Sequence, residues 1–368
     1  MAIVEKEIRD NPKSFKRSVV VYRTLDVLEE DKNYSYIKAL GKGSYGDVHL
    51  MFDPKRHSPI AVKVVTADCF SATEMALWPK LKHNNIVPVL ESYRLMSLDS
   101  TIFMMPAQQT SLQAMVYGSQ FRMLPDAMDK VKSWLYQTLC GLEYLHENNL
   151  CHLDLKADNV LISRNSTAKI CDFSFINTTD KNLYRYETGL PHIYRPPEAC
   201  NTLPADTPVN GKSFDAWSFG VMMVEIFTNL YMSKNIEENM CWLQDVYPTL
   251  YEILQEKKFT CAMGITFFNS SEEEIKQSLN FIHSFLMTDS DERVSISQAK
   301  RHPFLQKGTF YGPKPDTFWN WKLSIDHKEF NEMYIVKRKN RQWKMNTFKL
   351  TADDIKRYND AFFKTMFS

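Results

Sequence analysis

The chain of 368 residues lacks the features that mark several protein classes. Its seven cysteines are scattered and form no C-x-x-C pair, which argues against a zinc site or a disulfide framework and favours a reducing compartment. It has no run of about 18 apolar residues and no apolar signal core at its N-terminus, so we expect neither a membrane-spanning helix nor secretion. Its net charge of +1 carries no global signal for nucleic acid or an anionic membrane.

Glycine is also scarce, with eleven residues in the whole chain, and three of them lie within residues 41–46 (Gly-Lys-Gly-Ser-Tyr-Gly). Strand-like runs precede and follow this segment. Glycines at this spacing let a hairpin close tightly and offer backbone N–H groups to phosphates. A plain glycine-rich turn would look the same, whereas a dinucleotide-binding fingerprint is disfavoured because it requires a helix directly afterwards.

Hydrophobic periodicity divides the chain into a β-rich first part and a helical second part. Short apolar runs predict strands at residues 34–40, 48–52, 60–65, 86–90 and 101–105, interrupted by one helix at 72–78. Apolar residues at i, i+3 and i+4 predict helices at 131–147, 215–229 and 272–287. We therefore expect an α+β fold of two lobes with a cleft between them, divided into a leader (1–30) that packs on the first lobe, a first lobe (31–105), a second lobe (106–306) and a C-terminal tail (307–368).

An acidic segment in the second part carries the clearest chemistry. Residues 152–159 (His-Leu-Asp-Leu-Lys-Ala-Asp-Asn) are followed thirteen residues later by Asp172-Phe-Ser. Phosphoryl transfer needs a carboxylate that accepts a hydroxyl proton and oxygen ligands that hold Mg²⁺ on nucleotide phosphates. Asp154 suits the first task, and Asn159 and Asp172 suit the second.

In order and spacing these segments resemble the eukaryotic protein kinase family, in which a glycine-rich loop, a strand lysine, a catalytic loop and an Asp-Phe motif follow one another. The resemblance implies a two-lobed kinase fold that binds ATP and Mg²⁺. It makes Asp154 the catalytic base and Asn159 and Asp172 the metal ligands. Lys156, two residues after Asp154, resembles the lysine that steadies the γ-phosphate in serine/threonine kinases.

Lys63 stands on the expected strand at 60–65, where a lysine is usually an edge residue that extends its amine to solvent. In the family it grips the nucleotide phosphates and pairs with a helix glutamate, and Glu74 is the candidate. A local alternative is that Ser71 and Glu74 form a capping box at the start of the helix. Pro79 should end or kink this helix, which leaves it about two turns long.

The resemblance also implies a nucleotide site between the lobes. Met104 would be the gatekeeper, the backbone of Met105 and Ala107 would bond adenine, and Leu161 would lie beneath the base. The full expected set is Leu40, Gly41, Lys42, Gly43, Ser44, Tyr45, Gly46, Val48, Ala61, Lys63, Met104, Met105, Ala107 and Leu161.

Other segments resemble structural parts of the family, and Glu198 and Arg293 should form a buried ion pair. Three positions depart from the family pattern. Leu153 replaces the arginine that reads an activation-loop phosphate, and Ser174 replaces a glycine that permits backbone flips. Pro191 replaces a threonine that bonds the catalytic loop, and Thr188 could substitute only if that loop is remodelled.

The tail mixes thirteen basic and seven acidic residues with many aromatics. Such a mixture could bind nucleic acid, but we favour docking of the tail on its own domain. The basic run at 337–341 could be a nuclear import signal but is more often a solvated segment.

We therefore predict a cytoplasmic, alternatively nuclear, monomeric serine/threonine kinase that acts on protein substrates, without a membrane or nucleic-acid partner. The first alternative is a pseudokinase that binds ATP or partners as a scaffold, and the second is a small-molecule kinase.

Overall fold

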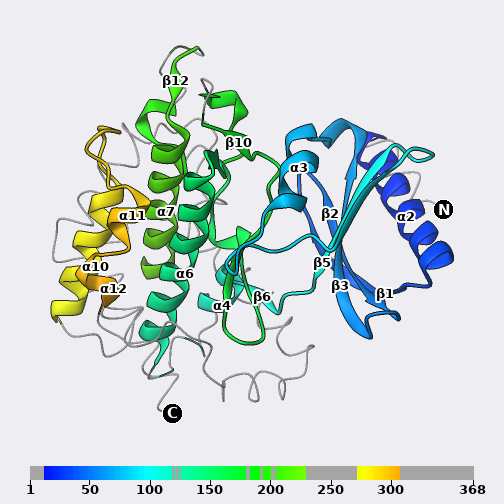
Figure 1. The fold of residues 1–368 in the computed structure, drawn as a ribbon, viewed down its shortest axis with the longest axis horizontal. Coiled ribbons are helices and arrows are strands. Elements are labelled where there is room, and N and C mark those ends of the chain that lie inside the picture. Colours follow the sequence, from blue (N-terminus) through cyan, green and yellow to red (C-terminus); the bar gives the residue numbers. More distant parts are fainter. Residues whose placement is uncertain are drawn as a thin grey trace.

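A computed structural model of the chain describes residues 12–117, 121, 124, 126–179, 183–190, 194–199, 204, 206–228 and 272–306. They form a β-sheet lobe and a helical lobe that meet near the end of strand β5 (Figure 1). The predicted two-lobed α+β architecture is therefore confirmed. Two earlier expectations, those on Pro191 and on the tail at 307–368, lie outside the described residues.

The first lobe is built on one antiparallel sheet with the strand order β1-β2-β3-β5-β4. Its strands are β1 (Ser35–Lys42), β2 (Asp47–Asp53), β3 (Ser58–Thr66), β4 (Glu91–Leu95) and β5 (Ser100–Pro106). Successive side chains of a strand point to opposite faces. On β3, Ile60, Val62 and Val64 therefore pack on one face of the sheet, whereas Ala61 and Val65 pack on the other.

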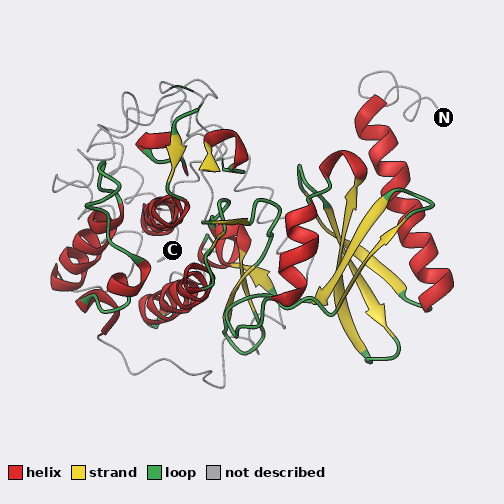
Figure 2. Cartoon of the chain, turned by 45° about the horizontal axis from the view of Figure 1, so that its top comes forward, coloured by secondary structure: helices red, strands yellow, loops and turns green. Residues whose placement is uncertain are grey.

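Helix α2 (Pro12–Lys32) covers the first of these faces, on the side of the sheet away from the helical lobe (Figures 1 and 2). Val21, Leu25 and Leu28 share a buried cluster with the sheet residues. Thr24 of α2 also forms a buried hydrogen bond with Ser100 of β5, with 2.9 Å between the hydroxyl oxygens. The helix is therefore an integral part of this lobe.

The strand predicted at 86–90 is wrong, because the edge strand of the sheet is the following segment, β4. Ile86 forms only an isolated bridge to Ile170, and the Val87 N–H donates to the Ile170 carbonyl at 2.9 Å. The Val87 carbonyl accepts from the indole of Trp78 at 2.9 Å. Ile86 and Val87 are apolar because they are buried between the lobes and not because they belong to the sheet.

The helical lobe places its long helices behind the catalytic segment. Among the described residues its helices are α4 (Leu112–Val116), α6 (Ala127–Glu147), α7 (Gly211–Thr228), α10 (Glu272–Phe285), α11 (Ile296–Ala299) and α12 (Pro303–Gln306). In the same part of the chain, short strands form small sheets: β6 (Thr110–Ser111) with β8 (Val160–Ile162) and β9 (Ala168–Ile170), β7 (Leu150–Cys151) with β10 (Asn177–Thr178), and β11 (Leu183–Tyr184) with β12 (Pro208–Val209). The apolar stripe predicted on α6 is buried, which fixes the helix beneath the segment at 152–159.

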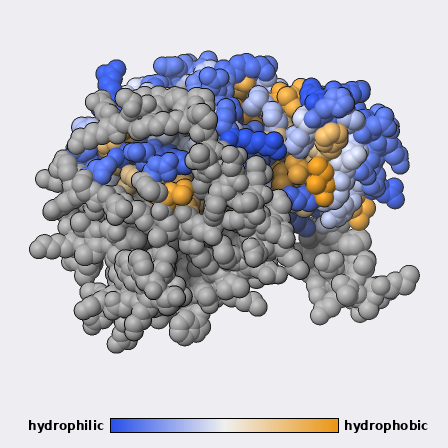
Figure 3. Space-filling model, turned by 90° about the horizontal axis from the view of Figure 1, so that it is seen from below, coloured by the Kyte–Doolittle hydropathy of each residue, from blue (hydrophilic) through white to orange (hydrophobic). Residues whose placement is uncertain are grey.

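Among the described residues, no helix has the length and apolar character needed to cross a membrane. The described surface seen in Figure 3 is mainly hydrophilic, with small hydrophobic areas, the largest on the side of the β-sheet lobe.

Candidate active site

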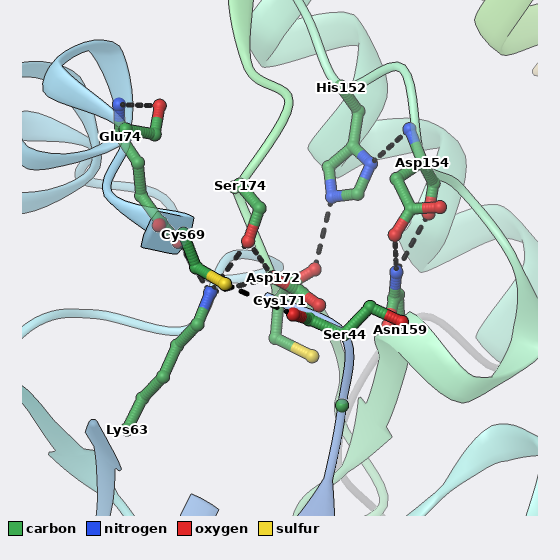
Figure 4. Close-up of polar contacts among 12 residues, drawn as sticks. Ser44, Lys63, Cys69, Glu74, His152, Asp154, Asn159, Cys171, Asp172 and Ser174 are labelled. Atoms are coloured by element: carbon green, nitrogen blue, oxygen red, sulfur yellow. Dashed lines mark hydrogen bonds and ion pairs between the residues drawn. The ribbon is translucent and has the colours of Figure 1, made fainter. Parts of the chain in front are cut away.

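Lys63 of β3 joins the two lobes at the centre of the site (Figure 4). Its Nζ lies 2.7 Å from Glu74 Oε1, 2.7 Å from Asp172 Oδ1 and 2.9 Å from Ser174 Oγ. Burial alone would lower the pKa of Lys63, but the carboxylates of Asp172 and Glu74 raise it above its ordinary value. Lys63 is thus a fixed cation at neutral pH, positioned where nucleotide phosphates would enter.

Glu74 lies on the short helix α3 (Ala72–Leu77), which continues as a 3₁₀ turn over Trp78–Lys80 at Pro79. Ser71 caps the helix, since its Oγ accepts from the Glu74 N–H at 3.2 Å. The Glu74 carboxylate, however, bonds Lys63. Both expectations therefore hold in part: the backbone of Glu74 is capped, and its side chain is the partner of Lys63.

Asp154 is held by two donors in the loop after β7. Lys156 Nζ lies 3.0 Å from each of its carboxylate oxygens. Asn159 Nδ2 donates at 2.8 Å both to Asp154 Oδ2 and to the Asp154 carbonyl. Burial raises the pKa of Asp154 above its ordinary value, and the Lys156 ammonium opposes that rise. The result is a carboxylate fixed in direction and more basic than an exposed one, as a proton acceptor requires.

Asp215, in the first turns of α7, anchors this loop through two backbone hydrogen bonds. It is fully buried, and its carboxylate accepts from the N–H groups of His152 and Leu153, each at 2.8 Å. Leu153 has a φ of 61°, a left-handed conformation that costs a leucine roughly 1–2 kcal/mol. The two hydrogen bonds offset this strain. The sequence indicated Asp215 only as a helix start, although an acid within the apolar stretch of α7 was a signal for a buried role.

The two expected metal ligands, Asn159 and Asp172, stand on segments that a backbone hydrogen bond joins. The Cys171 N–H donates to the Asn159 carbonyl at 2.9 Å, which ties the loop to the residue before Asp172. Because Asn159 Nδ2 faces Asp154, the amide oxygen of Asn159 points to the other side. Burial opposes ionisation of Asp172, but the Lys63 ammonium and the Ser174 hydroxyl hold its pKa well below the ordinary value. One ionised carboxylate and one amide oxygen fit Mg²⁺, which prefers hard oxygen ligands.

Ser174 takes part in the site although its residue type departs from the family pattern. Its Oγ donates to Asp172 Oδ1 at 2.7 Å and accepts from Lys63 Nζ at 2.9 Å. Glycine at this position could make neither bond. Ser174 therefore orients Asp172 Oδ1 toward Lys63, and the other carboxylate oxygen of Asp172 can bind a metal ion.

The side chain of Met104 does not line the site, so its assignment as gatekeeper is wrong. Met104 belongs to the cluster under α2, where the Tyr34 hydroxyl lies 3.7 Å from its sulfur. Because side chains alternate along β5, Met105 and Phe103 face the cleft, and Met105 pairs with Ala61 of β3. A shift of one residue in the assignment reverses the face of every side chain.

The remaining expected nucleotide residues lie on β1, β2, β3 and β8 and directly after β5. Val48 pairs with Lys63 across β2 and β3, and Leu161 lies on β8 against the cleft-side core. Leu40 of β1 is exposed, and Ala107 directly follows β5.

The glycine-rich loop, residues 41–46, closes over Lys63. The Gly43 N–H donates to the Gly46 carbonyl at 3.0 Å. A Cβ on Gly46 would lie 2.9 Å from Lys63 Cε, so any larger residue there would push against the lysine. The Tyr45 ring meets Phe175 edge-on, with 4.6 Å between the ring centroids. The loop thus contacts the segment that follows Asp172.

Leu153, Thr188 and the Glu198–Arg293 ion pair are the other features that the comparison with the family pattern singled out. Leu153 is fully buried and carries no charge toward the activation segment. Thr188 is buried. Arg293 bonds both carboxylate oxygens of Glu198, at 2.8 and 3.1 Å, as the resemblance implied.

This fold and this set of side chains define a phosphotransferase of the protein kinase class. The protein kinase domain family matches residues 34–305, and the chain belongs to this family. It is similar to mitogen-activated protein kinase 4 of Oryza sativa subsp. japonica (24% identical, covering 79% of this chain and 82% of the relative). It is also similar to mitogen-activated protein kinase mpkC of Aspergillus niger (26%, 88% and 83%) and to mitogen-activated protein kinase 13 of Bos taurus (25%, 87% and 89%). The chain is therefore a serine/threonine-type protein kinase in general terms.

Proposed function

We propose that this protein is catalytically active and transfers the γ-phosphate of ATP, with Mg²⁺, to serine or threonine hydroxyls of protein substrates. The observation that carries the proposal is the joint placement of Lys63, Glu74 and Asp172 across the two lobes, beside a buried Asp154 held by Lys156 and Asn159. A scaffold would not need to keep the buried carboxylates of Glu74 and Asp154 and the buried ammonium of Lys63 in this arrangement, because each buried charge costs free energy.

The side chains suggest a division of labour in the reaction. Asp154 orients the acceptor hydroxyl and takes its proton as the oxygen attacks the γ-phosphorus. Lys156 offsets the negative charge that the phosphoryl group brings beside Asp154, and Lys63 orients the non-transferred phosphates. Asn159 and Asp172 would hold Mg²⁺, which neutralises phosphate charge when bound. The phosphorus–oxygen bond to the leaving diphosphate breaks as the new bond forms.

Transfer of labelled phosphate tests the proposal. Purified protein is incubated with labelled ATP, Mg²⁺ and a generic basic protein, next to Asp154→Asn and Asp172→Ala. Asp154→Asn should bind MgATP normally but lose turnover by at least about 100-fold, since general-base catalysis typically contributes 10²–10⁴. Asp172→Ala should lose Mg²⁺-dependent ATP binding. The control is Asp99→Asn, an exposed acid in the β4–β5 turn that should change nothing.

The pseudokinase alternative predicts a different pattern. It is supported by the serine at position 174, where the family has glycine. Equal, background-level transfer in the wild type and Asp154→Asn, with intact MgATP binding, would replace the proposed function by a nucleotide-binding scaffold. Turnover with small hydroxyl compounds but not with proteins would indicate a small-molecule kinase.

A further inference from the structure

The side chain of Arg17 on α2, outside the matched family region, reaches the glycine-rich loop. It donates from Nη1 to the Ser44 carbonyl at 2.8 Å and from Nη2 to the Gly43 carbonyl at 2.7 Å. The same Nη2 lies 2.7 Å from Asp47 Oδ1, at the start of β2. A planar guanidinium thus holds two successive loop carbonyls and the loop's exit at once.

The helix that carries Arg17 is anchored firmly enough to act as a support. Besides its buried leucine and valine contacts, α2 is joined to the sheet by the Thr24–Ser100 hydrogen bond and by a 3.0 Å ion pair between Lys32 and Glu91. It precedes residue 34, where the family match begins. The contact is therefore an addition of this chain to the kinase domain.

The geometry of the peptide bond determines how the contact with Arg17 orients the N–H groups of the loop. In a trans peptide the C=O and N–H bonds point in opposite directions. Drawing the carbonyls of Gly43 and Ser44 toward Arg17 therefore turns the N–H groups of Ser44 and Tyr45 away from α2. On the inner side of the loop, a Cβ on Gly46 would touch Lys63, and the Tyr45 ring meets Phe175. The two N–H groups are thus directed to the side on which nucleotide phosphates would lie.

We infer that Arg17 is a positioning residue for phosphate binding: by holding the carbonyls of Gly43 and Ser44, it presets the backbone N–H groups of the glycine-rich loop toward the phosphates of the nucleotide. The inference rests on the proposed function, since it requires that the loop binds ATP. Preorganised N–H donors bind phosphate without the cost of ordering the loop at each turnover. The role concerns the phosphates and not adenine, whose expected contacts lie on β5, directly after it and on β8.

The test compares ligands with and without phosphates. Dissociation constants of the full chain for MgADP and for adenosine are measured by calorimetry for the wild type, Arg17→Met and Arg17→Lys. Arg23→Met, on the exposed face of the same helix, is the matched control. Thermal unfolding of each variant shows whether the protein is folded at the assay temperature, and steady-state kinetics give KM for ATP and kcat.

Arg17→Met should weaken MgADP binding and raise KM for ATP by about tenfold, roughly the effect of losing one charge-assisted hydrogen bond, while adenosine binding and kcat change little. Arg17→Lys should recover part of the affinity, because an ammonium keeps the charge but not the fork. Arg23→Met should match the wild type.

Unchanged MgADP affinity in Arg17→Met would overturn the inference. So would an equal loss for adenosine, because that result would mean α2 supports the whole lobe and not the loop. A wild-type protein that binds no MgADP would overturn the proposed function and this inference with it, whereas normal wild-type binding and turnover with an unresponsive Arg17→Met would overturn the inference alone.

Discussion

Replacing Arg293 with methionine should strongly destabilise the helical lobe, because its guanidinium is the hub of a buried network. Its Nη1 donates to Glu198 Oε1, to the Ser213 carbonyl and to Ser213 Oγ at 2.8–2.9 Å. Its Nε and Nη2 donate to the Met287 carbonyl at 3.2 and 3.0 Å, and the guanidinium lies 4.9 Å from the centre of the Trp217 ring. The side chain is fully buried, so water cannot replace these bonds.

The expected loss follows from what Arg293→Met leaves behind. Glu198 keeps a largely buried carboxylate without its cation, and removing one partner of a buried pair typically costs about 3–5 kcal/mol. For a domain of this size each kcal/mol lowers the melting temperature by about 2–4 °C, so we expect a decrease of roughly 6–20 °C.

Thermal unfolding followed by circular dichroism, with urea denaturation in parallel, measures this loss. The control is Arg94→Met, whose ion pair with Asp99 is exposed and should contribute about 0–1 kcal/mol. The double variant Arg293→Met/Glu198→Met should be more stable than Arg293→Met alone, because no unpaired charge remains. A decrease no larger than that of Arg94→Met, or a double variant less stable than Arg293→Met, would refute the argument from buried charge.

Three further predictions concern the site. Ser174→Gly should raise the Mg²⁺ concentration needed for half-maximal ATP binding several-fold, because the Asp172 carboxylate loses a hydrogen bond; an increase in turnover would instead show that serine holds the enzyme back. Phosphatase treatment should leave activity nearly unchanged, since Leu153 cannot pair with a phosphate as arginine would, and a large loss would show that another basic residue reads one. The raised pKa of Asp154 means that kcat should fall as the pH drops, at a higher pH than an ordinary aspartate would give. Lys156→Met, which removes the charge that lowers this pKa, should move the midpoint to still higher pH, and a shift in the opposite direction would contradict the assigned base.

Local sequence patterns were sufficient to predict most of the longer helices and strands of the described residues. Short apolar runs predicted β2, β3 and β5, and the i, i+3, i+4 stripe predicted α6, because burial within one element depends on residues close together in the chain. The strand at 86–90 was mispredicted because burial between the lobes makes the same apolar run as burial in a sheet. Met104 was mispredicted because residues 104 and 105 are both methionine. The alignment of the connector after β5 can therefore slip by one residue without any change in the residue type at the gatekeeper position.

The sequence by itself determined which chemical groups this protein has: Lys63, Asp154, Asn159 and Asp172 follow in an order and spacing that indicate phosphoryl transfer before any coordinates are known. The tertiary structure alone decided what holds those groups in place. Ser174 bonds Lys63, 111 residues away, Asp215 accepts from a loop more than 60 residues earlier, and Arg17 bonds loop carbonyls 26 and 27 residues later. Periodicity and motif spacing report only on neighbours along the chain. The partner of a buried polar group is instead set by which distant segment the packed core brings within hydrogen-bonding distance.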